Sequence, residues 1–250
     1  TESTAITINK KTIAVKANAK TKVYGELNPE FDYTYSGVIS GQTAKFTGNL
    51  ATSATASSEV GTYDITIGTL ALANNGTFLA NNYTISYTKA SLIITIKSTD
   101  NLTVTLSPSS YTYDGTAKKP TVTVKDGETT LTLNTHYTVS YSNNTNAGTA
   151  TVTVTGKDGT NYAGTISKNF TIAKAESTNP SLTAVNVTYD GASHEIGVSG
   201  GTGGTIYYRT SSDKVTFGSW STTKPSLTNV GKIYVQAYVK GDSNHNDTTA

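Results

Sequence analysis

Residues 147–154 read Ala-Gly-Thr-Ala-Thr-Val-Thr-Val, and this stretch decides the fold class. Its apolar residues alternate with threonine at a period of two, the period at which side chains change faces along a β-strand. Ala150, Val152 and Val154 are therefore expected on one face, against a core, with the threonines on the other. The stretch predicts a half-buried strand.

The same pattern occurs three times along the chain. Residues 60–67 read VGTYDITI and residues 230–237 read VGKIYVQA, so an apolar residue and a glycine precede an alternating strand each time. Recurrence of one landmark at regular intervals indicates tandem repeats.

Two further landmarks accompany each copy of the strand. Upstream lies a tyrosine–glycine turn, at Tyr24-Gly25, Tyr113-Asp114-Gly115 and Tyr189-Asp190-Gly191. Glycine accepts positive φ there, and aspartate can bind its own backbone. Downstream lies an asparagine followed by a ring, at Asn82-Tyr83, Asn161-Tyr162 and Asn244-His245.

The landmarks divide the chain into repeats. The complete copies end with an alternating strand and a lysine, at residues 92–97 and 170–174, and residues 5–10 (AITINK) match that ending. We therefore expect the closing strand of a preceding repeat, followed by three repeats, at residues 1–10, 11–97, 98–174 and 175–250.

The third repeat stops at Ala250, where its closing strand should begin. We expect this repeat to lack its last strand and to present an unfilled strand position. The N-terminal strand of a neighbouring copy is expected to fill that position by strand addition.

Composition agrees with an all-β protein. About one residue in five is threonine, and valine, isoleucine and tyrosine are frequent, all of which favour sheets. Repeats of this length with short alternating strands predict tandem small β-sandwich domains of the immunoglobulin-like type. The alternative is a β-grasp-like unit with one short helix, for which residues 41–45 and 70–74 are the only candidates.

Charge and composition exclude several classes of function. The net charge of +2 is spread along the chain, which argues against nucleic acid or an anionic membrane as the main partner. No apolar run approaches ~18 residues, so no membrane insertion is expected. The chain has no cysteine, which excludes disulfides and thiolate metal sites.

Catalytic signals are weak throughout the sequence. His136, His194 and His245 are scattered, and no Ser/His/Asp pattern surrounds them. We expect no enzyme activity and no cofactor.

Two sets of residues are candidate binding sites. Asp242, Asn244 and Asn246 space oxygen ligands as a calcium loop does, although an Asx-type turn explains them better. Tyr207, Tyr208 and Trp220 could stack on sugar rings, although a lone tryptophan in a small sandwich is more often part of the core. A Lys–Asn isopeptide cross-link requires a geometry that the sequence does not reveal.

The motifs resemble those of a known family. Residues 22–25 (KVYG), 33–37 (YTYSG) and 82–87 (NYTISY) resemble the MBG repeat domains of large bacterial surface proteins. The second repeat resembles the related YDG-type repeats at residues 111–115, 137–141 and 156–162. The third keeps residues 189–191 and 241–246 of the same pattern.

The resemblance implies an extracellular or bacterial cell-surface location in an adhesin-like protein. It predicts a non-catalytic tandem-repeat segment that acts as a stalk, a spacer or an adhesive array. We expect glycans, mucin or other surface proteins as partners, although the resemblance itself does not specify them. Two alternatives are a glycan- or mucin-binding module and a set of accessory domains in an extracellular enzyme.

Overall fold

The structure is a computed structural model that describes residues 1–249. Apart from two single-turn 3₁₀ helices, the regular elements of these residues are all β-strands, which confirms the all-β prediction. They form two compact units. The first contains Thr1–Leu102, Leu131–Thr138 and Thr155–Thr165, and the second contains Thr103–Thr130, Val139–Val154 and the chain from Ile166 onward. The second repeat contributes residues to both units.

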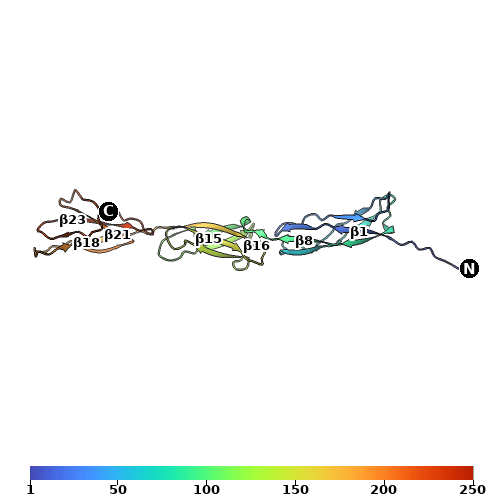
Figure 1. The fold of residues 1–250 in the computed structure, drawn as a ribbon, viewed down its shortest axis with the longest axis horizontal. Coiled ribbons are helices and arrows are strands. Elements are labelled where there is room, and N and C mark those ends of the chain that lie inside the picture. The colour runs from blue at the N-terminus through green and yellow to red at the C-terminus, as the bar shows by residue number, and fades with distance from the viewer. Residues whose placement is uncertain (250) are drawn as a thin grey trace. The chain divides into compact units, whose positions relative to one another are not determined.

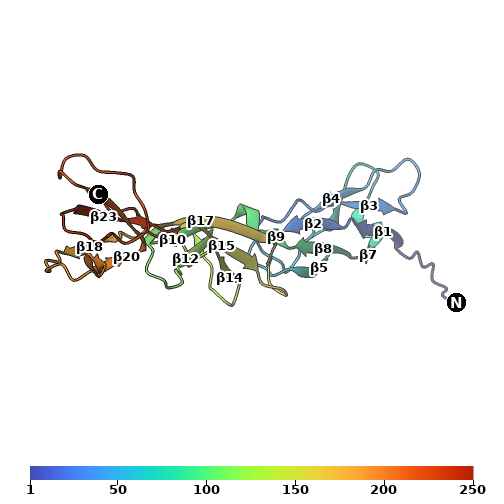
Figure 2. The ribbon, with the colours of Figure 1, turned by 60° about the vertical axis from the view of Figure 1, so that its left-hand side comes forward.

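The first repeat lies wholly in the first unit. Its elements are β1 (Lys11–Ala17), β2 (Lys20–Val23), β3 (Tyr33–Ser36), β4 (Lys45–Thr47), β5 (Gly61–Ile65), β6 (Ala71–Ala73), η1 (Ala80–Asn82), β7 (Tyr83–Thr88) and β8 (Ala90–Thr95). One sheet has the order β3-β1-β7 and another has the order β2-β8-β5, while β4 pairs with β6 (Figure 2). β8 runs parallel to β2 and antiparallel to β5.

The two three-stranded sheets share one hydrophobic core. β1 reads KTIAVKA, and its alternation buries Ile13, Val15 and Ala17 while the residues that alternate with them are exposed. Leu92 and Ile94 of β8 are buried in the same cluster. Because both sheets turn their apolar faces toward this cluster, the repeat is a small β-sandwich.

The β-grasp alternative is wrong because its helix does not form. Residues 71–73 are the strand β6, and residues 41–45 contain a turn that leads into β4. No α-helix occurs in residues 1–249. Within those residues, no helix is long and apolar enough to cross a membrane.

The second repeat follows the same plan. Its elements are β9 (Lys97–Ser98), η2 (Thr99–Asn101), β10 (Thr103–Ser107), β11 (Ser110–Thr112), β12 (Thr121–Asp126), β13 (Thr129–Thr130), β14 (Tyr137–Ser142), β15 (Gly148–Gly156), β16 (Tyr162–Ala163) and β17 (Thr165–Ala173). The strand orders are β10-β12-β13 and β11-β17-β15-β14. Ala150, Val152 and Val154 are each 0% exposed, so the face predicted for them is confirmed.

The third repeat has fewer paired strands. Its elements are β18 (Thr178–Thr183), β19 (His194–Glu195), β20 (Gly197–Thr202), β21 (Gly204–Ser211), β22 (Ser226–Leu227) and β23 (Tyr234–Gly241). They pair two by two, as β18-β20, β19-β22 and β21-β23.

The alternating strand predicted to follow Val230-Gly231 begins at Tyr234 and not at Lys232, so its first two residues are a correction. Residues 231–233 belong to no strand, although the matching glycines Gly61 and Gly148 begin β5 and β15. Among the described strands β23 pairs with β21 alone, and a segment without a hydrogen-bonding neighbour does not form a ladder.

The N-terminal residues 1–10 belong to no strand and extend away from β1 (Figure 1). Ile6 is 95% exposed and Ile8 is 91% exposed. These residues alternate as a closing strand does, but in this structure they have no sheet partner.

Candidate functional site: the junctions between repeats

The tyrosine–glycine turns form as the sequence predicts. Gly25, Gly115 and Gly191 have φ values of 87°, 79° and 78°, which favour glycine. The Oδ1 atom of Asp114 accepts a hydrogen bond of 2.8 Å from the backbone N–H of Thr116. The turns are therefore held by local backbone contacts.

The first compact unit brings the second repeat's asparagine against the end of the first repeat. The backbone N–H of Val60 donates to Asn161 Oδ1 at 2.9 Å. The backbone N–H of Lys97 donates to the carbonyl oxygen of Asn161 at 3.0 Å. Asn161 thus accepts hydrogen bonds from two backbone N–H groups, one through its side-chain oxygen and one through its carbonyl oxygen.

The ring after this asparagine completes the contact. Tyr162 is 4% exposed, and its ring meets Tyr24 edge-on, with centroids 5.6 Å apart and planes at 77°. β16 (Tyr162–Ala163) pairs in parallel with β9 (Lys97–Ser98). We call the contact of Asn161 and Tyr162 with Tyr24, Val60 and Lys97 the first junction.

The second compact unit repeats this arrangement between the second and third repeats. The backbone N–H of Ala147 donates to Asn244 Oδ1 at 2.8 Å, and that of Ala175 donates to the carbonyl oxygen of Asn244 at 2.9 Å. The His245 ring meets Tyr113 edge-on, with centroids 5.3 Å apart and planes at 85°. We call the contact of Asn244 and His245 with Tyr113, Ala147 and Ala175 the second junction.

The two junctions are built from the same three landmarks. The asparagine–ring step of one repeat contacts the tyrosine of the turn and the residue before the strand glycine in the repeat before it. Each hydrogen bond of this kind contributes about 0.5–1.5 kcal/mol net, and an edge-on ring pair adds a similar amount. Together these contacts are large enough to hold two repeats in register.

A glycine lets the chain approach closely in each junction. A side chain on Gly156 would place its Cβ 2.7 Å from the carbonyl oxygen of Tyr162. A Cβ on Gly241 would collide in the same way with the carbonyl oxygen of His245. Glycine is therefore required at both positions by contact with the asparagine–ring step.

Comparison with known families assigns the repeats. Residues 13–93 match the family described as MBG domain (YGX type), and residues 102–176 match the family described as MBG domain. Residues 13–93 and 102–176 are thus two MBG domains of different types. MBG domains are repeat modules of large surface proteins. No curated protein and no solved structure matches the chain.

The side chains of the calcium candidate in the third repeat have other contacts. Asp242 Oδ1 accepts from the backbone N–H of Asn244 at 2.7 Å, which is an Asx-type turn. Asn244 Oδ1 serves the second junction, and Asn246 Nδ2 donates to Glu176 Oε1 at 2.8 Å. A calcium site at Asp242, Asn244 and Asn246 stays a prediction, and these contacts give the residues a structural role.

Asp242 also orients the ring of the second junction. His245 Nδ1 lies 2.8 Å from Asp242 Oδ1. The hydrogen bond from His245, together with the one from the Asn244 backbone, lowers the pKa of Asp242 below its ordinary value. The carboxylate is thus held in its charged form beside the junction.

The aromatic candidates of the third repeat do not form a flat platform. Tyr208 is 7% exposed and part of the core, while Tyr207 and Trp220 are half-buried. The Trp220 ring packs against Tyr238 at 4.6 Å with planes at 69°, and the Arg209 guanidinium lies 4.4 Å from its centroid. A glycan site at these residues stays a prediction.

The three histidines are each engaged locally. His136 Nδ1 accepts from the backbone N–H of Thr132 at 2.9 Å, and His194 Nε2 lies 2.9 Å from Asp190 Oδ1. His245 lies in the second junction. Residues 1–249 contain no group of three or more His, Cys, Asp or Glu placed to hold a metal ion.

Proposed function

We propose that the chain is a non-catalytic stalk or spacer segment of a secreted or cell-surface bacterial protein. Its repeats are docked to one another through their asparagine–ring steps. The observation that supports this is the recurrence of the junction: Asn161 and Asn244 make equivalent hydrogen bonds to Val60 and Ala147. Such junctions suit a stalk that holds another part of the protein away from the cell surface, because they restrict bending between the repeats.

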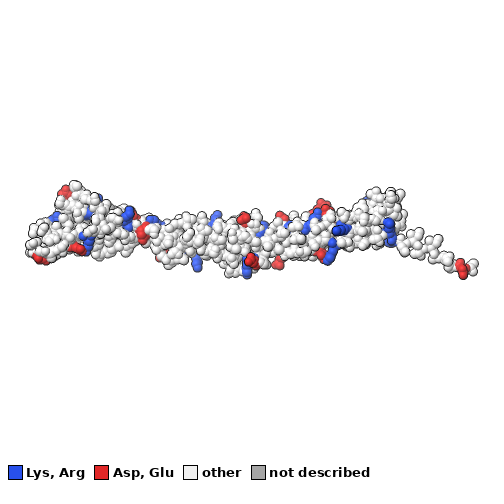
Figure 3. Space-filling model, in the orientation of Figure 1, with Lys and Arg blue, Asp and Glu red and all other residues white. Residues whose placement is uncertain are grey.

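The engagement of the titratable side chains supports a structural role. Asp114, Asp190 and Asp242 all have lowered pKa values. Hydrogen bonds hold each of them charged: Lys118 and Thr116 bind Asp114, the Ala192 backbone and His194 bind Asp190, and His245 and the Asn244 backbone bind Asp242. Acidic and basic side chains are scattered over the visible face without a patch of one sign (Figure 3), which supports a partner other than nucleic acid.

An adhesive array is the finer alternative within the same proposal. Repeated modules on one chain convert weak individual contacts into avidity when several are engaged together. Glycans, mucin or other surface proteins are the partners that suit such an array. The half-buried rings of Tyr207 and Trp220 are the only candidates that we assign to direct glycan contact.

Distances between spin labels test whether the junctions stiffen the chain. The sequence has no cysteine, so labels can be placed at Thr84 and Thr123, which are both exposed and belong to the first and second repeats. We expect a narrow distance distribution for the unaltered chain. Asn161→Ala removes the acceptor for the Val60 N–H and is expected to broaden it.

A second pair of labels provides the matched control. Labels at Thr123 and Thr202 report on the second junction, and both residues are exposed. Asn244→Ala should broaden this distribution and leave the Thr84–Thr123 pair unchanged, whereas Asn161→Ala should do the reverse. If the distance distributions of the unaltered chain are as broad as those of the Asn161→Ala and Asn244→Ala variants, the spacer proposal is overturned.

A further inference from the structure

The only arginine and the only tryptophan of the chain meet in the third repeat. The central carbon of the Arg209 guanidinium lies 4.4 Å from the centroid of the Trp220 ring and 5.1 Å from that of Phe217. All three side chains are half-buried. A guanidinium is attracted to the face of an aromatic ring, most strongly to that of tryptophan. The two rings therefore hold the Arg209 side chain in place.

A hydrogen bond fixes the orientation of this guanidinium. Arg209 Nε donates to Gln236 Oε1 at 2.8 Å, and the two residues face one another across β21 and β23. Among the residues that the structure describes, no carboxylate pairs with Arg209 and no acceptor binds its Nη groups. The remaining N–H donors of its planar fork are thus available to a ligand.

The strands around Arg209 carry no acidic side chain. Neither β21 nor β23 contains an aspartate or a glutamate. Asp213, the nearest acidic residue in the sequence, binds its own loop instead. Its Oδ1 atom accepts hydrogen bonds of 2.7 Å from Ser211 Oγ and from the backbone N–H of Thr216, and these bonds lower the pKa of Asp213 below its ordinary value. This carboxylate is therefore held by its loop and leaves the guanidinium unpaired.

Arg209 shares one face of the β21–β23 hairpin with other groups suited to a sugar. Side chains change faces at each residue of a strand, so this face also presents Tyr207, Gln236, Tyr238 and Lys240. The rings of Tyr207 and Tyr238 are half-buried, with centroids 5.7 Å apart. Successive residues on one face of a strand are about 7 Å apart. A sugar whose carboxylate binds Arg209 therefore places its ring near Tyr207.

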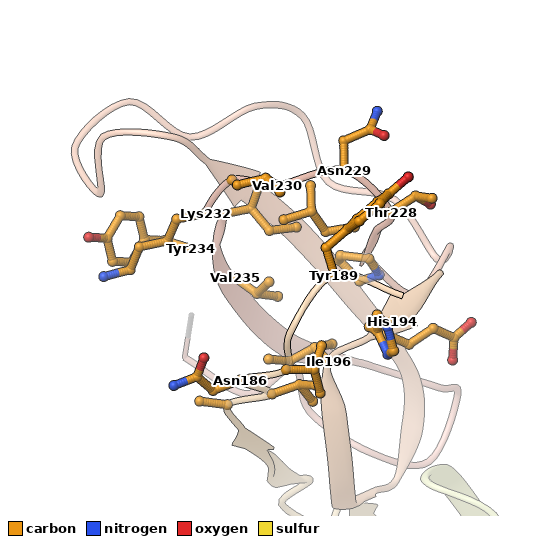
Figure 4. A pocket seen from close by; sticks show the side chains of 18 of the residues that line it. Asn186, Tyr189, His194, Ile196, Thr228, Asn229, Val230, Lys232, Tyr234 and Val235 are labelled. Carbon is orange, nitrogen blue, oxygen red and sulfur yellow. The ribbon is translucent and has the colours of Figure 1, made fainter. Parts of the chain in front are cut away.

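The charge of this face suits an anionic partner. Arg209 and Lys240 are the only charged residues of β21 and β23. Just before β23, Lys232 Nζ lies 4.8 Å from the centroid of the Tyr234 ring, and Figure 4 shows the two side chains together at one edge of a groove. Cations on the strands and beside them, without an acidic side chain on either strand, complement a negatively charged ligand.

We infer that this face binds an acidic glycan, with Arg209 paired to the carboxylate of a uronic or sialic acid residue. A guanidinium fork binds a planar carboxylate through two parallel hydrogen bonds, and here the fork is already held in position. The sugar ring lies against Tyr207 and Trp220, the rings assigned above to glycan contact. The inference rests on the adhesive form of the proposed function and adds the class of glycan.

Fluorescence of Trp220 measures this binding directly, because it is the only tryptophan. The full chain is titrated with an oligogalacturonate and with sialyllactose. Each has a neutral counterpart, which is the oligosaccharide with its carboxylates reduced to hydroxymethyl groups and lactose, respectively. We expect at least one acidic ligand to bind about tenfold or more tightly than its counterpart, since a charge-assisted bidentate pair is lost with the carboxylate. If neither acidic ligand binds more tightly than its counterpart, the inference is overturned.

Three variants test the role of the guanidinium. Arg209→Lys keeps the positive charge but loses the fork, and it should weaken binding of the acidic ligand about tenfold. Gln236→Glu leaves Arg209 and its rings unaltered but sets a carboxylate beside Nε, so it should weaken binding as much. Lys168→Gln, at an exposed position of the second repeat, changes the net charge by the same amount and should bind as the unaltered chain does. Full binding in both Arg209→Lys and Gln236→Glu would refute the carboxylate site.

The remaining outcomes separate this inference from the proposed function. If the neutral oligosaccharides bind as tightly and Arg209→Lys leaves their binding unchanged, the chain is adhesive but the carboxylate site is wrong. If no oligosaccharide binds, the adhesive form of the proposal fails as well, and the spin-label distances still test the spacer. An oligoglutamate that binds as tightly as the acidic oligosaccharides would overturn the glycan in favour of an acidic protein partner.

Discussion

Replacing Tyr162 with alanine is expected to lower the free energy of unfolding by about 3–5 kcal/mol, the usual effect of removing a large buried ring. The Tyr162 ring is 4% exposed and contacts Tyr24 and His136 edge-on at 5.6 and 6.1 Å. Its loss leaves a cavity at the first junction and also removes the contact that couples two repeats. Urea unfolding should show both the lower midpoint and a separation into two transitions.

Tyr24→Ala is the matched control for this variant. Tyr24 is half-buried and lies on the first-repeat side of the same ring pair. Its removal should lower the free energy of unfolding by about 0.5–1.5 kcal/mol for the lost ring contact. The loss of its buried apolar area adds a further, smaller decrease than at Tyr162. If Tyr162→Ala destabilises the chain no more than Tyr24→Ala does, Tyr162 is not the main buried group of the junction.

Gly156→Ala is expected to destabilise the first junction by about 1–3 kcal/mol, the usual effect of forcing an extra methyl group into a packed site. The added Cβ would lie 2.7 Å from the Tyr162 carbonyl oxygen and 2.8 Å from its carbonyl carbon. These are backbone atoms, so the asparagine–ring step has to move away from Val60 and Lys97. Calorimetric unfolding of the full chain measures the effect.

Gly61→Ala separates this collision from a general effect of replacing glycine. The nearest heavy atom to a Cβ on Gly61 is 3.8 Å away, which is an ordinary contact, and the residue lies beside the same junction. We expect its free energy of unfolding to change by no more than about 0.5 kcal/mol. If Gly61→Ala lowers the free energy of unfolding as much as Gly156→Ala does, close approach to Tyr162 is not the cause of the destabilisation.

The sequence predicts the strands and turns well because their signals are local. The alternation around Val152 places a buried face, and Asp114-Gly115 forms the predicted turn. The onset of β23 is predicted two residues too early, since alternation alone cannot show that residues 231–233 lack a neighbouring strand. Neither candidate segment for the single short helix of the β-grasp alternative is helical, because strand pairing, as in β6, prevails over a weak helical preference.

The junctions are not predicted, although their residues stand out in the sequence. Asn161 and Asn244 bind backbone groups 101 and 97 residues away, so no local spacing reveals their partners. Asn244 instead suggests an Asx-type turn or a calcium ligand when it is considered with its neighbours alone. The available signal is that an asparagine and a ring recur together in all three repeats, and the structure shows this step in a junction for the second and third.

Amide hydrogen exchange measured residue by residue tests the docking of repeats most directly. The backbone N–H groups of Val60 and Ala147 donate to Asn161 and Asn244, whereas Val230, at the same position of the third repeat, is 87% exposed. We predict that the Val60 and Ala147 amides are protected and that the Val230 amide exchanges rapidly. Exchange at Val60 and Ala147 as fast as at Val230 would contradict the account, because the repeats would then not be docked through their asparagines.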